Sequence, residues 1–192
     1  MLSYELKREL LGIARSSIAA ALRRESTISI DAPTPSEELL KPGGAFVTLR
    51  TDGELRGCIG YMESLLPLAS AVAEVAVKAA FDDPRFPPLS LPELEHTSLE
   101  ISVLSPVRRV SSKDEVRVGE HGVVLEHGFN KGVLLPQVAV EYGWTVEEFL
   151  DAICRKCGLK SSAWLDPEAK ISVFTAEVFE EDEILRERSA QS

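Results

Sequence analysis

The stretch AFVTLRTDGELRGCIGY, residues 45–61, contains two apolar runs joined by Asp52-Gly53. An Asp-Gly pair tolerates the positive φ angles of a tight turn, and between apolar runs it is a strong short-range signal for a β-hairpin. The stretch therefore predicts antiparallel strands over 45–51 and 54–61, and the rest of the fold can be read outward from this hairpin.

The hairpin opens an order of elements that occurs twice in the chain. The expected elements are the hairpin 45–61, the helix 68–81 and the strand 99–104, followed by the hairpin 123–135, the helix 145–157 and the strand 170–179. Ile-Ser-Val even stands in both final strands, at 101–103 and 171–173. The order predicts an α+β fold with mostly antiparallel sheets, flanking helices and two lobes. Internal duplication of a hairpin-helix-strand unit is one interpretation of the repeat.

The remaining segments complete the predicted organisation. Apolar residues at three- and four-residue spacing predict an amphipathic helix over 3–24, and a Pro-rich loop follows over 31–42. We expect a single domain over 1–180, with two subdomains joined near 82–98, and a frayed acidic tail over 181–192. The segment DDPRFPP at 82–88 is expected to form a stiff loop.

Composition and charge exclude several classes of protein. The 192 residues carry 21 Lys and Arg against 31 Asp and Glu, a net charge of −10. Such a charge argues against nucleic-acid binding and against anionic membrane surfaces. No uncharged run is long enough to span a bilayer, and the charged N-terminus predicts no signal peptide. Three cysteines are too few for a disulfide framework, so the expected location is the reducing cytoplasm.

The segment that most strongly indicates a functional site is LRGCIG at 55–60. Alternation along a strand puts Arg56, Cys58 and Gly60 on one face. A guanidinium beside the sulfur favours the reactive thiolate, and Gly60 would leave space next to it. The alternative is a buried structural cysteine with glycines that relieve crowding, since free cysteine is among the most buried residue types.

Two further polar residues are candidates for the same site. Arg85 is displayed by a loop stiffened by prolines, which suits anion recognition. The alternative is an ion pair with Asp82 or Asp83, or an interaction with the C-terminus of the preceding helix. His121, followed by Gly122, is a candidate base for Cys58, whereas the alternative is a solvated histidine in a turn.

Cys154 and Cys157 form a lone C-x-x-C near the end of the helix 145–157. A redox pair is usually placed at a helix N-terminus, where the dipole stabilises a thiolate, and a zinc site would need a second pair of ligands. Cys154 also continues the apolar face of Phe149 and Ile153. We therefore expect both cysteines in the core, and the sequence predicts no metal site and assigns no cofactor.

The LRGCIG stretch resembles the hallmark of the AMMECR family. Three other stretches fit the same family: DPRFPPL at 83–89, His121-Gly122, and LPQV at 135–138 running into Gly143-Trp144. The resemblance covers residues 5–180 and indicates a microbial stand-alone member. It implies an α+β fold with a larger and a smaller subdomain, and a functional site at the hallmark.

The resemblance also implies a setting, because microbial members are associated with a Memo-like protein and a radical S-adenosylmethionine protein in one modification pathway. Two hypotheses follow. In the first, the protein is a thiol-dependent enzyme or enzyme component, with catalytic candidates Cys58 and His121 and ligand-binding candidates Arg56, Gly57, Gly60 and Arg85. In the second, the same residues form a non-catalytic module that binds a small molecule or a protein partner such as the Memo-like protein. The sequence names no substrate.

Overall fold

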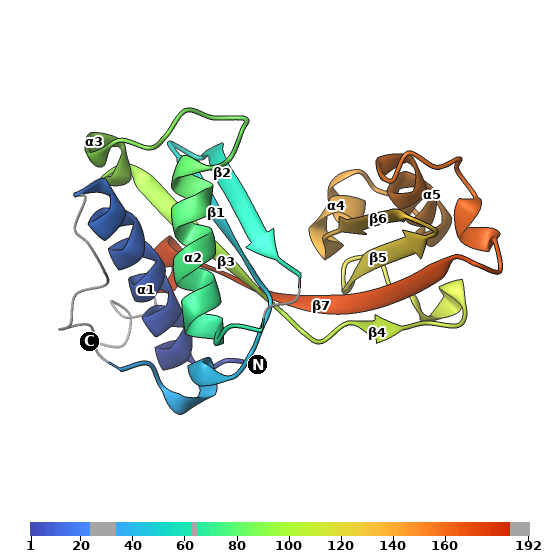
Figure 1. Ribbon diagram of the computed structural model, residues 1–192, viewed down its shortest axis with the longest axis horizontal. Helices are drawn as coiled ribbons and strands as arrows, with labels where there is room; N and C mark the ends of the chain where they lie inside the picture. The colour runs from blue at the N-terminus through green and yellow to red at the C-terminus, as the bar shows by residue number, and fades with distance from the viewer. Residues whose placement is uncertain (24–33, 63–64, 185–192) are drawn as a thin grey trace. The chain divides into compact units, whose positions relative to one another are not determined.

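The computed structural model describes residues 1–23, 34–62 and 65–184 (Figure 1). The chain divides into two compact units, unit 1 comprising 1–104 with 177–192 and unit 2 comprising 105–176. The junction expected near 82–98 therefore lies inside unit 1. None of the described helices is both long and apolar enough to cross a membrane.

Unit 1 is built on the hairpin that the sequence predicts. Its strands are β1 (Ala45–Thr51), β2 (Glu54–Tyr61), β3 (Thr97–Leu104) and the last residues of β7 (Lys170–Glu180), and its helices are α1 (Tyr4–Leu22), η1 (Glu37–Leu40), α2 (Leu68–Phe81) and α3 (Leu91–Leu94). β1 pairs antiparallel with both β2 and β3, which leaves β2 at the edge of the sheet. Asp52 and Gly53 have φ angles of 52° and 83°, as the predicted tight turn requires.

The core of unit 1 lies between the sheet and the pair α1 and α2, which lie side by side over one face of it (Figure 1). Alternate residues of β1, namely Ala45, Val47 and Leu49, are fully buried against the helices. The residues between them, including Thr48, face the other side of the sheet. Small residues along α2 let this helix approach β1 and β2 closely.

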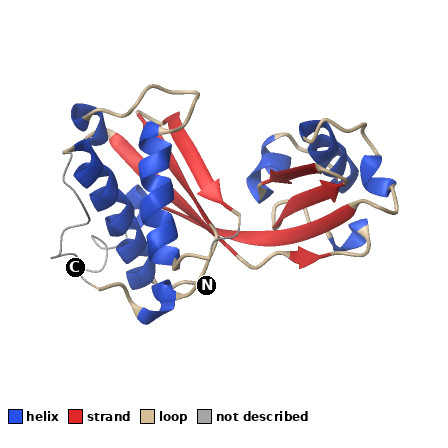
Figure 2. Cartoon of the chain, viewed as in Figure 1, coloured by secondary structure: helices blue, strands red, loops and turns tan. Residues whose placement is uncertain are grey.

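Unit 2 repeats the topology of unit 1. Its elements are β4 (Arg108–Arg109), η2 (Lys113–Glu115), β5 (His121–His127), β6 (Asn130–Leu134), α4 (Pro136–Glu141), α5 (Val146–Lys156), η3 (Ala163–Leu165) and the first part of β7 (Figure 2). β5 pairs antiparallel with β6 and β7, just as β1 pairs with β2 and β3. The two Ile-Ser-Val stretches occupy the third strand of each unit, with Ile101 opposite Val47 and Ile171 opposite Leu125. The α+β class with antiparallel sheets is confirmed, and duplication as the origin of the repeat stays a prediction.

The structure adds elements that the sequence pattern did not indicate. The short helix α3 begins with a capping box between Ser90 and Glu93, and β4 pairs with β7. Of the expected frayed tail, residues 181–184 are helical. Glu181 accepts hydrogen bonds from Arg15, and Ile184 is buried. The rest of that tail, and residues 31–33 of the expected Pro-rich loop, lie outside the described residues.

Candidate functional site

The strand that carries the hallmark contains a β-bulge at Arg56. In the pairing of β1 with β2, Leu49 stands opposite Gly57 and Arg50 stands opposite Leu55, so Arg56 has no residue opposite it. The uninterrupted alternation expected for 55–61 is therefore wrong at this residue, because a bulge re-aims a side chain within its strand. From Gly57 onward the alternation resumes.

The two glycines of the hallmark are explained by close packing. A Cβ atom at Gly57 would lie 2.1 Å from the backbone oxygen of Ala79 in α2, and one at Gly60 would lie 2.2 Å from the ring of Phe46. Gly57 therefore lets the edge strand approach the helix, and the ring of Phe46 fills the space that Gly60 leaves. Contact of either glycine with a ligand stays a prediction.

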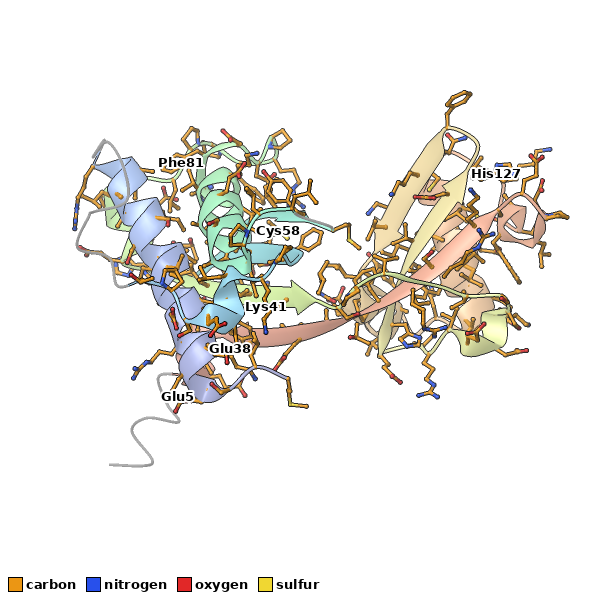
Figure 3. All side chains as sticks on the ribbon, turned by 60° about the horizontal axis from the view of Figure 1, so that its bottom comes forward. Glu5, Glu38, Lys41, Cys58, Phe81 and His127 are labelled. Atoms are coloured by element: carbon orange, nitrogen blue, oxygen red, sulfur yellow. The ribbon has the colours of Figure 1, made fainter. Side chains whose placement is uncertain are left out.

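Cys58 is part of unit 1 (Figure 3). It lies on β2, and the strand register places it directly opposite Thr48 of β1. Its thiol is free and half-buried, and its Sγ accepts a hydrogen bond of 3.3 Å from Thr48 Oγ1. Because Leu49 and Gly57 face the helices, Thr48 and Cys58 face the other side of the sheet. The sulfur is thus held on the sheet face that α1 and α2 do not cover.

A buried carboxylate connects Cys58 to Arg85. Asp83, whose side chain is 2% exposed, accepts a hydrogen bond of 2.9 Å from the backbone N–H of Cys58 and one of 2.7 Å from Arg85 Nη2, both at Oδ2. Its Oδ1 accepts from Arg85 Nε at 2.9 Å and from the Arg85 backbone N–H at 3.1 Å. The Arg85 guanidinium holds the pKa of Asp83 well below its usual range.

This arrangement follows from the position of β2. An edge strand has N–H groups that no neighbouring strand pairs with, and a charged acceptor satisfies such a donor well. Asp83 does this for Cys58 and at the same time positions the guanidinium of Arg85. The ion pair between Arg85 and Asp83, the structural alternative for Arg85, is therefore present. The ion pair leaves Arg85 accessible to a ligand, since its side chain remains 53% exposed.

Arg56 pairs with a carboxylate of its own. Its Nε donates to Glu93 Oε1 at 3.0 Å and its Nη2 to Glu93 Oε2 at 3.5 Å. The bond from Arg56, with a second from the backbone N–H of Ser90, lowers the pKa of Glu93 to about 2. The sequence assigned the charge of Arg56 to the sulfur of Cys58, whereas in the structure its guanidinium pairs with Glu93.

Both arginines flank one aromatic ring. The guanidinium carbons of Arg56 and Arg85 lie 5.9 Å and 5.4 Å from the centre of the Phe86 ring, within the range of cation–π attraction. Cys58, Asp83, Arg85, Phe86, Arg56 and Glu93 therefore form one cluster in unit 1, which we call the hallmark cluster. Sequence reasoning named Asp83 only as an ion-pair partner and missed Glu93. The Ser90-to-Glu93 capping spacing was the available signal for Glu93.

His121 belongs to unit 2 and begins β5. It is largely buried, and its Nδ1 accepts a hydrogen bond of 3.2 Å from the backbone N–H of Arg117. The solvated-turn interpretation is therefore wrong. Gly122 is needed for packing, since a Cβ there would lie 2.2 Å from the ring of Phe174. A role of His121 as a base for Cys58 stays a prediction.

The C-x-x-C cysteines lie in the packing of unit 2. Cys154 is fully buried in one cluster with Phe149 and Ile153, as the periodicity predicts, and Cys157 packs against the backbone at Gly132. Burial raises the pKa of both thiols, which disfavours thiolate chemistry there. Within residues 1–23, 34–62 and 65–184 no group of three or more His, Cys, Asp or Glu side chains gathers to hold a metal ion.

Cys154→Ala is expected to destabilise the protein by about 1–2 kcal/mol, because it removes a buried sulfur and leaves a small cavity. Cys157→Ala is expected to cost less, since this thiol is only half-buried. Urea unfolding followed by circular dichroism measures both. Equal costs for the two changes would contradict the packing described here.

Comparison with known proteins identifies the family. A family model described as AMMECR1 matches residues 11–179. Protein TK0174 of Thermococcus kodakarensis is 42% identical over 193 aligned positions, covering 93% of this chain and 94% of the relative. Protein MK0488 of Methanopyrus kandleri is 41% identical, covering 95% and 91%.

A solved structure supports the same assignment. The crystal structure of the uncharacterized protein PH0010 from Pyrococcus horikoshii matches with a TM-score of 0.83 and 40% identity, covering 92% of each chain. Sequence and fold thus agree over nearly the whole chain, and the expected resemblance is confirmed. This chain belongs to the AMMECR1 family.

Proposed function

We propose that the hallmark cluster is a thiol site and that the protein is a thiol-dependent enzyme or enzyme component with Cys58 as its nucleophile. The observation that carries this proposal is the Asp83 carboxylate, which binds the backbone N–H of Cys58 and the guanidinium of Arg85 through the same oxygen. Arg85 Nη2 and the Cys58 nitrogen are thereby no farther apart than the sum of these two short bonds. A fixed cation beside a partly exposed cysteine favours its thiolate.

The chemistry available to such a site is nucleophilic group transfer. The bond from Sγ to an electrophilic carbon forms as the bond from that carbon to its leaving group breaks, and the leaving group departs with the electron pair. The thiol proton goes to solvent before the attack. Arg85 retains unused donors beside the thiol, so it can also hold an anionic part of the reactant.

The family resemblance supplies a setting for this proposal, a modification pathway that includes a Memo-like protein and a radical S-adenosylmethionine protein. The second candidate is a non-catalytic module for a small ligand or a protein partner. It is favoured by one observation, the hydrogen bond from Thr48 to the sulfur, which also suits a cysteine that is merely packed.

Arg85→Gln is expected to slow alkylation of Cys58 by iodoacetamide at pH 7 about threefold. Removing the cation beside Cys58 takes away electrostatic support of the attacking sulfur, and the factor is modest because the side chain of Arg85 is half-exposed to solvent. The rate is measured at the Cys58 peptide by mass spectrometry, so the other two cysteines need not be changed.

Two variants control this experiment. Arg108→Gln removes an arginine from unit 2 that is 56% exposed and paired with Glu115, which matches the exposure and pairing of Arg85. Arg108→Gln should leave the alkylation rate of Cys58 unchanged. Arg85→Lys, which keeps the positive charge, should retain most of that rate. A Cys58 that is inert in every variant until the chain is unfolded would make the binding module the better account.

A further inference from the structure

The hallmark cluster contains an unsatisfied donor. Arg56 Nη1 is buried and has no hydrogen-bond partner among the described residues, and the side chain of Arg56 is only 10% exposed. An unpartnered group of this kind on a charged side chain is costly, so it indicates an acceptor that the described residues do not supply. Glu93 occupies the other edge of the guanidinium, through Nε and Nη2.

Arg85 binds its own carboxylate through the same two nitrogens, although its side chain is 53% exposed where that of Arg56 is 10% exposed. Its Nε and Nη2 are bound by Asp83, while its Nη1 donates no hydrogen bond among the described residues. Both guanidinium groups lie within 6 Å of the centre of the Phe86 ring, so they are no farther apart than the sum of those two distances. Two arginines near one half-buried ring therefore each keep an Nη1 that no described residue accepts from.

The charges of the cluster select the kind of acceptor. Asp83 and Glu93 already balance Arg85 and Arg56, so the cluster is neutral before any ligand binds. A doubly charged phosphate would add two negative charges to a partly buried site that already holds two carboxylates and a thiol, whereas a carboxylate adds one. Carboxylate geometry also matches the planar fork of a guanidinium.

We propose that the hallmark cluster binds a carboxylate, held by Nη1 of Arg56 and of Arg85, so that the reactant of Cys58 is a small carboxylate-bearing electrophile. This inference rests on the proposed thiol site, whose substrate class it names.

Iodoacetate and iodoacetamide test the proposal directly. They share the reactive carbon and the leaving group, but only iodoacetate carries a carboxylate. We measure the ratio of their rates at the Cys58 peptide in the native protein and in the urea-unfolded chain. The native ratio is expected to exceed the unfolded ratio about tenfold, as one added charge-assisted hydrogen bond provides. Arg56→Gln should bring the native ratio down to that of the unfolded chain, and Arg108→Gln should not.

A second measurement does not depend on the thiol. At fixed ionic strength, acetate in place of chloride is expected to raise the thermal unfolding midpoint of the Cys58→Ser protein, because a ligand that binds only the native state stabilises it. Arg56→Lys, which keeps the charge but not the fork, should remove this effect. Arg56→Lys also takes the place of Arg56→Gln in the alkylation experiment if the Arg56→Gln protein does not fold.

The outcomes separate the two proposals. Cys58 reacting fast with both reagents, with the same rate ratio native and unfolded, would overturn the carboxylate site and leave the thiol site standing. Cys58 inert to both reagents would overturn the thiol site, and the acetate measurement then decides the carboxylate site alone. If Cys58 is inert and acetate does not shift the thermal unfolding midpoint, the carboxylate site is overturned as well.

Discussion

Gly57→Ala is expected to destabilise the protein by more than about 3 kcal/mol, the upper end of the cost of overpacking. The added methyl group would lie 2.1 Å from the backbone oxygen of Ala79, and a backbone atom inside a helix cannot rotate away as a side chain can. Either β2 or α2 has to move, and both carry the core of unit 1. Chemical unfolding followed by circular dichroism measures the loss.

Gly12→Ala is the matched control for this change. Gly12 is exposed within α1, and a Cβ there meets nothing within 4 Å. The same substitution is therefore expected to stabilise the protein by about 0.5–1 kcal/mol through helix propensity. A Gly57→Ala protein whose stability lies within about 1 kcal/mol of the wild type would show that the strand and helix are not in the close contact described.

Asp83→Asn is expected to cost about 2 kcal/mol at pH 7, the range for hydrogen bonds to a charged group, kept low because Arg85 is half-exposed. The change removes the charge that binds Arg85 and weakens the acceptor of the Cys58 N–H. It should also slow alkylation of Cys58, because Arg85 is no longer held beside it. Unfolding free energy and the Cys58 alkylation rate are measured on the same protein.

The stability supplied by Asp83 also depends on pH. Its pKa in the folded protein lies below the value of about 3.9 in an unfolded chain, so on acidification the unfolded state takes up the proton first. The contribution is therefore complete above about pH 5 and is lost progressively as the pH falls further. Glu93, with its pKa lowered to about 2, acts in the same direction.

Comparing unfolding free energies at pH 6 and pH 3 tests this dependence. The wild type should lose about 1 kcal/mol more between these pH values than Asp83→Asn, which has no carboxylate to protonate. Asp82→Asn, the same substitution at the exposed neighbouring residue, should behave like the wild type. Equal losses in the wild type and Asp83→Asn would mean that Asp83 is not the buried, hydrogen-bonded carboxylate described.

Much of the fold could be predicted because local patterns decide it. The Asp52-Gly53 turn, the small residues of α2 and the capping box of Thr145 and Glu148 at α5 each specify an element without reference to the rest of the chain. Two short elements were missed, one because it depends on a distant partner and the other because a single turn is too short to show a periodic pattern. β4 is two residues long and exists through its pairing with β7, and α3 is a single turn fixed by its cap.

The hallmark cluster could be anticipated only in part from the sequence. The hallmark and the 83–89 stretch do meet, through the bond from Cys58 to Asp83. Period-two alternation, however, gives no sign of a bulge, so the direction of Arg56 and its pairing with Glu93 were not predictable. The bridging role of Asp83 depends on β2 being an edge strand, which is a property of the assembled sheet.

Activation of Cys58 by the folded protein can be measured by peptide-resolved alkylation of the wild type at pH 7. Iodoacetamide incorporation is followed at Cys58, Cys154 and Cys157 in the native protein and in the urea-unfolded chain. We expect folding to accelerate the reaction at Cys58 and to slow it at Cys154 and Cys157, whose pKa values burial raises. A Cys58 that folding protects as it protects Cys154 would contradict this expectation and make Cys58 a packing residue.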